Sequence, residues 1–423
     1  MAYVADLHIH SRFSRACSSA LNIPNLSLWA KYKGIDLMGT GDCLHPLWQT
    51  ELKSVLKKEQ DGFFEFEGVK FVLTTEVACI YSEGGKVRRI HTLIMLPSFE
   101  SAINLSSVLT KKGMNLSSDG RPILGLSTKA LCEIVFQIEP GALIIPAHIF
   151  TPWFSLFGSE SGYDLLEDCF GEFSDQIYAI ETGLSSEPAM NWRIKDLDKK
   201  SIVSFSDAHS LPRLGREVTI MGGNLTFDSL RYDLKNQNIV GTIEFFPEEG
   251  KYHYSGHRSC GIVYSPKELK EKGEICPKCK RRLTVGVMTR VEDLADRSSD
   301  EIGVMSDKEG IIKSKEFPKR SGFRMLVQLE EILAEAFNTS VSTQKVKNEY
   351  VRLVKTFDNE LMILTKRKIE EIAKVAGEKV AEGVKRVREG KLKIKPGFDN
   401  TYGVVKIWDK EEKSVEEAQI SMF

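Results

Sequence analysis

The sequence predicts an α/β protein: a barrel or doubly wound sheet, then a small metal-binding segment, then a helical C-terminal region. Three observations predict this order. Nearly continuous runs of Val, Ile, Leu and Phe alternate with helical stretches through residues 1–245, as in sheets covered on both faces. Cysteines and histidines cluster in residues 251–286. From Met325 onward, apolar residues recur at the three- and four-residue spacing of helices.

The first half contains eight expected strands with helices between them. The strands are expected at 3–7, 35–40, 70–81, 90–96, 142–147, 177–181, 202–206 and 239–246. The helices are expected at 25–33, 47–59, 99–112, 128–137, 188–197 and 227–235. Pro24 and Pro188 fall in first helical turns, where proline is tolerated. This βα alternation predicts a barrel or a doubly wound sheet.

A break at 247–250 opens the second half. Two short strands are expected at 261–264 and 283–287, helices at 325–337, 345–357 and 369–388, and a hairpin at 391–408. We therefore predict a barrel or sheet at 1–247, a Cys- and His-bearing metal-binding segment at 248–290, a basic helical domain at 291–410 and a flexible acidic tail at 411–423.

Composition and charge narrow the class of protein. With 42% apolar and 28% charged residues, the chain is neither disordered nor a small disulfide scaffold. No stretch approaches the ~20 apolar residues of a membrane span, and the first residues have no basic or apolar leader, so we expect a cytoplasmic protein. Residues 1–250 hold 23 basic against 31 acidic side chains, and residues 251–410 hold 34 against 24. This asymmetry indicates either a cation site beside a polyanion-binding surface or two ordinary solvated surfaces.

Histidines and carboxylates gather in or after the expected strands of the first half. They are His8, His10, Asp42, Glu76, His91, His148, Asp207 and His209, with His45 in a loop that could equally be a simple turn. In barrels of this class the carboxyl ends of the strands form one mouth, so residues distant in sequence can converge there. Imidazole with carboxylate suits zinc, manganese or iron, and bridging carboxylates hold two ions together. The pattern predicts a multinuclear metal site.

These residues resemble the PHP (polymerase and histidinol phosphatase) superfamily. The likeness rests on Asp6-Leu-His8-Ile-His10, Gly41-Asp42, Glu76, His91, Pro146-Ala-His148 and Ser206-Asp207-Ala-His209. It implies a distorted (β/α)7 barrel that hydrolyses phosphoesters with two or three divalent ions (Zn, Mn or Mg), held by the residues named above. Asp42 stands where the superfamily often has histidine, and Arg15-Ala-Cys17 stands where it usually has aspartate or histidine.

A second cluster has the spacing of a structural zinc site. His257-x-x-Cys260 is followed after fifteen residues by Cys276-x-x-Cys279, which is typical of a closed tetrahedral site. The alternatives are a reduced, metal-free turn, or His253 as the fourth ligand. Lys278, Arg281 and Arg282 lie beside the ligands, and phosphates are the natural counterpart of such a basic surface.

The order of these segments resembles the endonuclease Q family over roughly residues 1–408. The resemblance implies a DNA-repair enzyme that cleaves 5′ to deaminated bases (uracil, hypoxanthine, xanthine) and abasic sites. Our hypothesis is metal-assisted hydrolysis, with Glu76 and Asp207 in catalytic roles. Further DNA contacts are expected from Arg12, Arg15, Trp153 and Trp192.

Two other functions fit parts of the sequence. A small-molecule phosphoesterase of the histidinol-phosphatase type would share the metal ligands but would need neither the zinc segment nor the basic helices. A helicase-associated DNA-binding module would keep the metal site for structure. The end of the chain, Gln419-Ile-Ser-Met422-Phe423, loosely resembles a sliding-clamp-binding peptide, so a clamp is a candidate partner.

Overall fold

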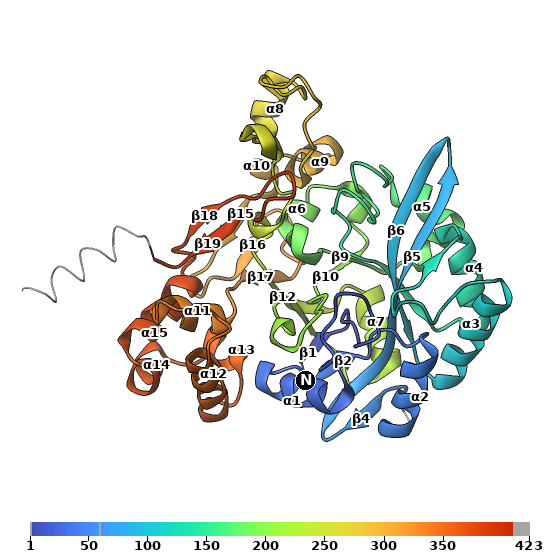
Figure 1. Ribbon diagram of the computed structural model, residues 1–423, viewed down its shortest axis with the longest axis horizontal. Coiled ribbons are helices and arrows are strands. Elements are labelled where there is room, and N and C mark those ends of the chain that lie inside the picture. Colours follow the sequence, from blue (N-terminus) through green and yellow to red (C-terminus); the bar gives the residue numbers. More distant parts are fainter. Residues whose placement is uncertain (1, 59–60, 409–423) are drawn as a thin grey trace, which may run out of the picture.

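Strands and helices alternate through the first 245 residues, as the sequence predicts, around one large sheet (Figure 1). The computed structural model describes residues 2–58 and 61–408. Within these residues no helix is long and apolar enough to cross a bilayer. The predicted α/β fold with a helical C-terminal region is confirmed. The tail at 411–423 and its clamp-like peptide lie outside the described residues.

The strands that carry the candidate site form a continuous run of ladders. In spatial order they are β12 (Ile239–Glu244), β11 (Val218–Met221), β1 (Tyr3–Asp6), β2 (Leu37–Gly39), β5 (Val69–Glu83), β6 (Lys86–Leu96) and β8 (Leu143–Pro146). β1, β2 and β5 are parallel, and β6 is antiparallel to both β5 and β8. β8 therefore points the same way as β1 and β2, and the carboxyl ends of these strands share one edge.

Short elements complete this part of the chain. A separate parallel pair, β9 (Ala179–Glu181) and β10 (Ser201–Val203), lies beside β8. The short strands β3 (Lys57–Lys58), β4 (Phe64–Phe66) and β7 (Ile123–Leu124) pair at the margins of the sheet. The helices are α1 (Ile23–Lys33), α2 (Pro46–Val55), α3 (Phe99–Lys111), α4 (Thr128–Ile138), α5 (Leu166–Phe170), α6 (Pro188–Asn191) and α7 (Phe227–Lys235). Side chains of Asn22, Ser98, Ser127 and Thr226 cap four of them, which satisfies backbone donors that a helix start leaves free.

β5 and β6 form a long hairpin whose inner half is buried. Its ladder runs from Leu73 opposite Leu96 to Glu83 opposite Lys86. The tip turns through Gly84 and Gly85, both at positive φ, which glycine adopts without strain. The outer half extends beyond the body of the protein (Figure 1). In the inner half Glu76 is paired with Leu93, and Ala78 is paired with His91. Glu76 and His91 are therefore diagonal neighbours, and their side chains lie on the same face of the hairpin.

The segment after residue 250 forms a lobe that projects from the body (Figure 1). It contains β13 (Ser255–His257), β14 (Ile262–Tyr264), α8 (Pro266–Lys272) and α9 (Val287–Leu294). A capping box between Ser265 and Glu268 starts α8. The lobe has its own small core of Tyr264, Leu269, Cys276 and Leu283.

The C-terminal region is joined to the first half through the main sheet. After α10 (Ser299–Ile302), the strands β15 (Val304–Ser306), β16 (Ile312–Ser314) and β17 (Gly322–Met325) extend the sheet, and β17 pairs in parallel with β12. The helices α11 (Leu329–Ala336), α12 (Gln344–Thr356), α13 (Glu360–Thr365), α14 (Ile369–Ala376) and α15 (Glu378–Arg388) follow, and the hairpin β18 (Lys393–Lys395) with β19 (Val404–Lys406) ends the described chain.

A buried ion pair connects the two halves. Lys33 at the end of α1 reaches Glu360 of α13, with Nζ 2.6 Å from Oε2 and side-chain exposures of 1% and 4%. Glu360 also accepts hydrogen bonds from the Tyr350 hydroxyl and from the Leu329 backbone N–H. Because three groups share this carboxylate, the helical region is held against α1 at one position.

Several expected elements differ from the structure, for reasons of packing. The strand expected at 283–287 is wrong: Val287 begins α9, and Thr284 makes only an isolated bridge to Gly256. The helix expected at 369–388 is two helices, since Gly377 adopts a φ of 89° between them. The sequence analysis missed β11 and β17, short strands that pair with β1 and β12, which are distant in sequence. It also missed the short elements β15, β16 and α13.

The Lys33–Glu360 pair generates a stability prediction. Glu360→Ala leaves the Lys33 ammonium buried without its partner, so we expect the free energy of unfolding to fall by ~3–5 kcal/mol in urea denaturation. The control is Glu67→Ala, which breaks the exposed pair between Lys31 and Glu67 and should change stability by less than ~1 kcal/mol. Equal effects of the two substitutions would contradict the assigned role of the buried pair.

Candidate metal centre

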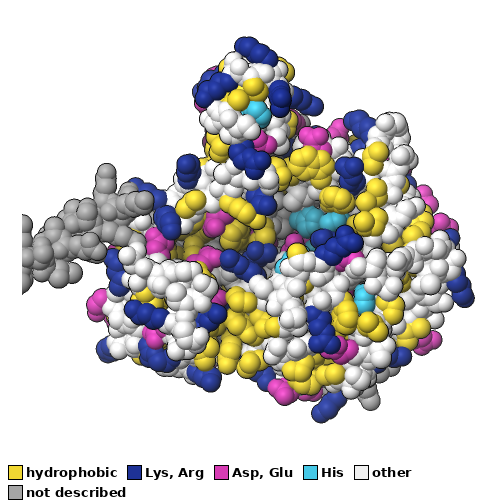
Figure 2. Space-filling view, in the orientation of Figure 1, with side chains coloured by type: hydrophobic (Ala, Val, Ile, Leu, Met, Phe, Trp, Pro, Cys, Tyr) yellow, Lys and Arg dark blue, Asp and Glu magenta, His cyan; other side chains and the backbone are white. Residues whose placement is uncertain are grey.

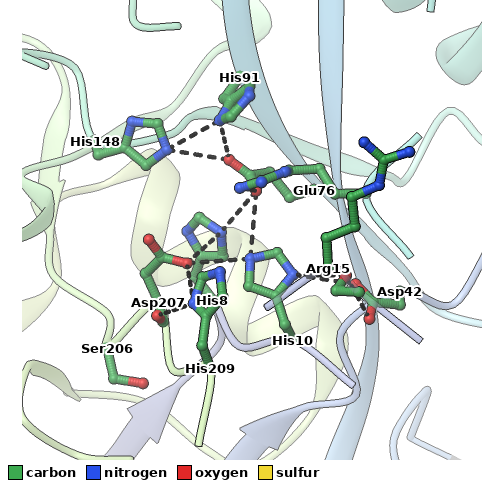
Figure 3. A network of polar contacts seen from close by, with 12 residues as sticks. His8, His10, Arg15, Asp42, Glu76, His91, His148, Ser206, Asp207 and His209 are labelled. Atoms are coloured by element: carbon green, nitrogen blue, oxygen red, sulfur yellow. Dashed lines mark hydrogen bonds and ion pairs between the residues drawn. The ribbon is translucent and has the colours of Figure 1, made fainter. Parts of the chain in front are cut away.

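Side chains from separate strands meet at one edge of the sheet. The residues drawn together there are His8, His10, Glu76, His91, His148, Asp207 and His209 (Figure 3). They form three groups whose ligand atoms lie within 4.8 Å of one another: His8 with His10 and Glu76, His10 with Asp207 and His209, and Glu76 with His91 and His148. Positions spread over two hundred residues thus converge on one site.

The carboxylate of Glu76 lies at the centre of this site. Its Oε1 is 2.6 Å from His91 Nδ1 and 3.1 Å from His148 Nε2. Its Oε2 is 3.4 Å from His10 Nε2 and 3.7 Å from His8 Nε2. One carboxylate therefore faces two pairs of imidazoles, one pair through each oxygen, which is the arrangement of a bridging ligand.

Asp207 lies opposite Glu76, on the more open side. Its Oδ1 is 3.1 Å from His10 Nε2, 3.6 Å from His209 Nδ1 and 3.8 Å from His8 Nε2. The Asp207 side chain is 23% exposed, whereas that of Glu76 is fully buried. Asp207 is thus the carboxylate of the group that a bound molecule can reach.

Two further carboxylates fix the orientation of the imidazoles. Glu181, at the end of β9, accepts from His8 Nδ1 at 2.9 Å and from the His148 backbone N–H at 2.9 Å. Asp42 lies 3.2 Å from His10 Nδ1. Both rings therefore present Nε2 to the centre, as in the carboxylate–histidine–metal arrangement of many metalloenzymes. The sequence analysis missed Glu181. This residue is at the end of an expected strand, and Glu76 and Asp207 likewise lie in or directly after expected strands.

Attraction between the carboxylates and the imidazoles explains how so many ionisable groups are buried together. Burial acts to raise the pKa of Glu76, but the imidazoles around it hold that pKa well below the usual range. Burial acts to lower the pKa of His8, yet Glu181 and Glu76 raise it well above its usual value. Burial lowers the pKa of His91 to about 4 despite its contact with Glu76.

One atom tests whether a metal ion fits. His8 Nε2 is buried and has no hydrogen-bond partner, a costly arrangement unless another group supplies one. It faces the carboxylates of Glu76 and Asp207. A cation bound between them would satisfy all three, and imidazole with carboxylate is a donor set for divalent metals such as zinc and manganese. The residues present fit divalent metal ions.

The second cluster brings its four residues together in the projecting lobe. His257, Cys260, Cys276 and Cys279 offer ligand atoms within 4.8 Å of one another. Lys280 follows with a φ of 62°, the left-handed conformation for which many such turns use glycine. Burial acts to raise the pKa of the Cys276 thiol, but hydrogen bonds from the backbone N–H groups of Cys279 and Lys278 help to lower it to about 6. A low thiol pKa favours the thiolate that binds zinc.

Two of the candidate site residues lie apart from the three groups. His45 is 4% exposed and stacks on Phe13, with ring centroids 4.5 Å apart. Of the residues in the three groups, Asp42 has a hydrogen-bond contact with His10, at the Nδ1 atom that points away from the centre. The residues expected to contact DNA differ in how exposed their side chains are. Trp192 is 1% exposed and packs against Phe323, so the structure contradicts a DNA contact there: the ring belongs to the core.

The other expected DNA contacts lie at the surface. Arg12 pairs with Glu51, and Arg15 extends beside the cluster in Figure 3 with its Nε 3.4 Å from Asp119. Trp153 is half-buried, with its ring against Tyr252. Lys278, Arg281 and Arg282 are exposed on the lobe. Figure 2 shows Lys and Arg side chains on the lobe and around a central hollow in which histidine is visible.

Comparisons with known proteins match nearly the whole chain. The crystal structure of the lesion-specific endonuclease PfuEndoQ from Pyrococcus furiosus superposes with a TM-score of 0.82 and 33% identity, over 98% of this chain and 99% of that one. An endonuclease Q complex with a 27-mer duplex, which has an abasic lesion at the active site, gives a TM-score of 0.82 and 33% identity over 97% and 98%.

Two other comparisons concern a longer relative. The uncharacterized protein MJ0043 of Methanocaldococcus jannaschii is 30% identical over 281 residues, which are 63% of this chain and 33% of that protein. The chain thus spans about a third of the length of this curated relative. Residues 328–391 match the family named for the MJ0043 C-terminal domain, and they cover α11 to α15.

The position of Glu181 generates a prediction on metal retention. Glu181→Gln keeps the shape of the side chain but removes the charge that orients His8, so metal affinity should fall by about 10–100-fold. Competition with a chelator, followed by elemental analysis of the protein, measures this. Glu172→Gln, an exposed substitution just before β9, is the matched control. Unchanged metal retention in Glu181→Gln would refute the orienting role.

Proposed function

The chain belongs to the endonuclease Q family, and on that premise we propose that it is a metal-dependent endonuclease of damaged DNA. It hydrolyses the phosphodiester 5′ to deaminated bases (uracil, hypoxanthine and xanthine) and to abasic sites. The observation that carries this proposal is the likeness over 97% of the chain to an endonuclease Q bound to a duplex with an abasic lesion. The buried histidine–carboxylate cluster supplies the chemistry.

We assign the metal ions to the histidine–carboxylate cluster. The ligands are His8, His10, Glu76, His91, His148, Asp207 and His209, with two or three ions of the zinc, manganese or magnesium type. One structural zinc ion is held by His257, Cys260, Cys276 and Cys279. A divalent ion in the cluster supplies a Lewis acid, which makes water a nucleophile near neutral pH and offsets phosphate charge.

The protein's own groups prepare the site for this reaction. Glu181 and Asp42 hold the Nδ1 protons of His8 and His10, so that both Nε2 atoms remain free toward the centre. Glu76 keeps its charge because imidazoles surround it. Asp207, whose side chain is 23% exposed, is placed to accept a hydrogen bond from the attacking water. Hydrolysis of phosphate esters is among the slowest uncatalysed reactions, which explains the density of charged groups.

A lesion-specific enzyme must also reach its target base. Extrusion of a nucleotide from the stack requires a few kcal/mol, and least where pairing is already weak. Trp153, Arg12 and Arg15 near the mouth, and Lys278, Arg281 and Arg282 on the lobe, are our candidates for DNA contacts. The small-molecule phosphoesterase alternative gives no reason for this lobe or for the helical region, both of which the likeness to endonuclease Q covers.

The most direct test of the proposed function uses end-labelled duplexes. Each carries one uracil, one hypoxanthine, one xanthine or one abasic site, and an undamaged duplex is the control. With manganese or magnesium we expect a single nick immediately 5′ of the lesion, which a chelator abolishes. Turnover of p-nitrophenyl phosphate without nicking would instead support the small-molecule phosphoesterase.

Asp207→Asn tests the assigned site. It removes the exposed carboxylate of the cluster without changing its size, so nicking should fall by at least about 100-fold, while DNA affinity in a gel-shift assay is retained. The control is Asp228→Asn, at an exposed position in the first turn of α7. Nicking at the wild-type rate by Asp207→Asn would contradict the assignment.

A further inference from the structure

A loop between α3 and α4 covers one side of the cluster and brings an arginine into it. The Gly120 backbone N–H donates to the Phe13 carbonyl at 3.0 Å. A Cβ at Gly120 would lie 2.3 Å from Asp42 Oδ2 and 2.4 Å from Ser14 Oγ. Only glycine allows the loop to approach this closely, and the next residue, Arg121, is thereby directed to Glu76.

The carboxylate of Asp42 is fully engaged by the protein. Its Oδ2 accepts from the Ser11 backbone N–H at 2.7 Å, from Ser11 Oγ at 2.6 Å and from Ser14 Oγ at 2.9 Å. Its Oδ1 faces His10 Nδ1 at 3.2 Å. Asp42 is completely buried beneath Gly120. These four contacts use both oxygens, and Asp42 therefore orients His10 rather than binding an ion.

Arg121 brings a fixed positive charge to this side of the cluster. Its Nη1 is 3.2 Å from Glu76 Oε2, the oxygen that faces His8 and His10. Its side chain is 29% exposed, while that of Glu76 is fully buried, so the guanidinium extends from the buried carboxylate toward solvent. Asp119 holds the loop in place by accepting from the backbone N–H groups of Arg121 and Arg15.

We propose that Arg121 takes the place of a third metal ion and binds the scissile phosphate directly. This inference rests on the proposed function. In the reaction, a water oxygen forms a bond to phosphorus, the bond from phosphorus to the leaving 3′-oxygen breaks, the water gives up a proton and the leaving oxygen gains one. Arg121 remains protonated throughout and donates N–H bonds to a non-bridging oxygen as charge builds there. A planar guanidinium suits this task because it can hold Glu76 with one edge and phosphate with another.

The competing explanation is that Arg121 only neutralises Glu76. Phosphorothioate substrates separate the two explanations. A sulfur in place of one non-bridging oxygen weakens every contact with that oxygen, from a hydrogen bond or from a metal ion, so an effect that disappears when Arg121 is removed reports a contact with Arg121. The substrate is an abasic duplex with the Rp or the Sp phosphorothioate at the scissile position. The variants are Arg121→Ala and Arg121→Lys, and the matched control is Lys112→Ala, an exposed cation after α3.

We expect Arg121→Ala to slow single-turnover cleavage by about 100-fold or more, with DNA affinity and thermal stability retained. One phosphorothioate isomer should slow the wild type and the control, but should no longer slow Arg121→Ala relative to its own oxygen substrate. Arg121→Lys should regain part of the rate because it keeps the charge. Elemental analysis of the wild type should give about three metal ions per chain, two in the cluster and one in the lobe.

The outcomes separate this inference from the proposed function. Wild-type protein that leaves the abasic duplex intact would overturn the proposed function itself. If the wild type cleaves while Arg121→Ala keeps the sensitivity to both isomers, Arg121 does not bind the phosphate. A third metal ion in the cluster of the wild type would likewise overturn the proposal.

Discussion

The structure depends on the compensation of one buried charge. Glu76 carries a fully buried carboxylate, and an uncompensated charge in such a position would be very unfavourable. His8 and His10 from the segment after β1, His91 from β6 and His148 from the segment after β8 surround it. The order of the strands and the register of the β5–β6 hairpin bring these rings to one carboxylate.

Backbone strain is concentrated at the same place. Asp42, His148 and Asp207 adopt positive φ values of 49°, 31° and 45°, which non-glycine residues rarely do. Strain of this kind persists where the surroundings hold it and is common at functional sites. Gly183 permits the backbone to approach His148 closely, since a Cβ at Gly183 would lie 2.3 Å from His148 Cβ. The strained backbone directs His148 and Asp207 into the cluster and Asp42 to His10.

The sequence predicts those parts of the site that a local pattern marks. The His-x-His and Asp-x-His pairs follow apolar strands, so their convergence could be predicted from the alternation alone. Glu181 ends a short strand but lacks a paired motif such as His-x-His, and Arg121 lies in a loop without periodicity. Trp192 was assigned to DNA because the sequence around a single aromatic residue does not show whether its ring is buried. In the structure the ring is buried against Phe323. The short strands β11 and β17 form through pairing with strands distant in sequence.

The central claim is that divalent ions fill the space around Glu76. Anomalous diffraction from crystals grown with manganese measures this directly, with data collected on both sides of the absorption edge of the metal. We expect one peak beside Glu76 Oε2 in reach of His8 Nε2 and His10 Nε2, and another beside Oε1 in reach of His91 and His148. Anomalous density confined to the Cys–His lobe, with none near Glu76, would contradict the claim.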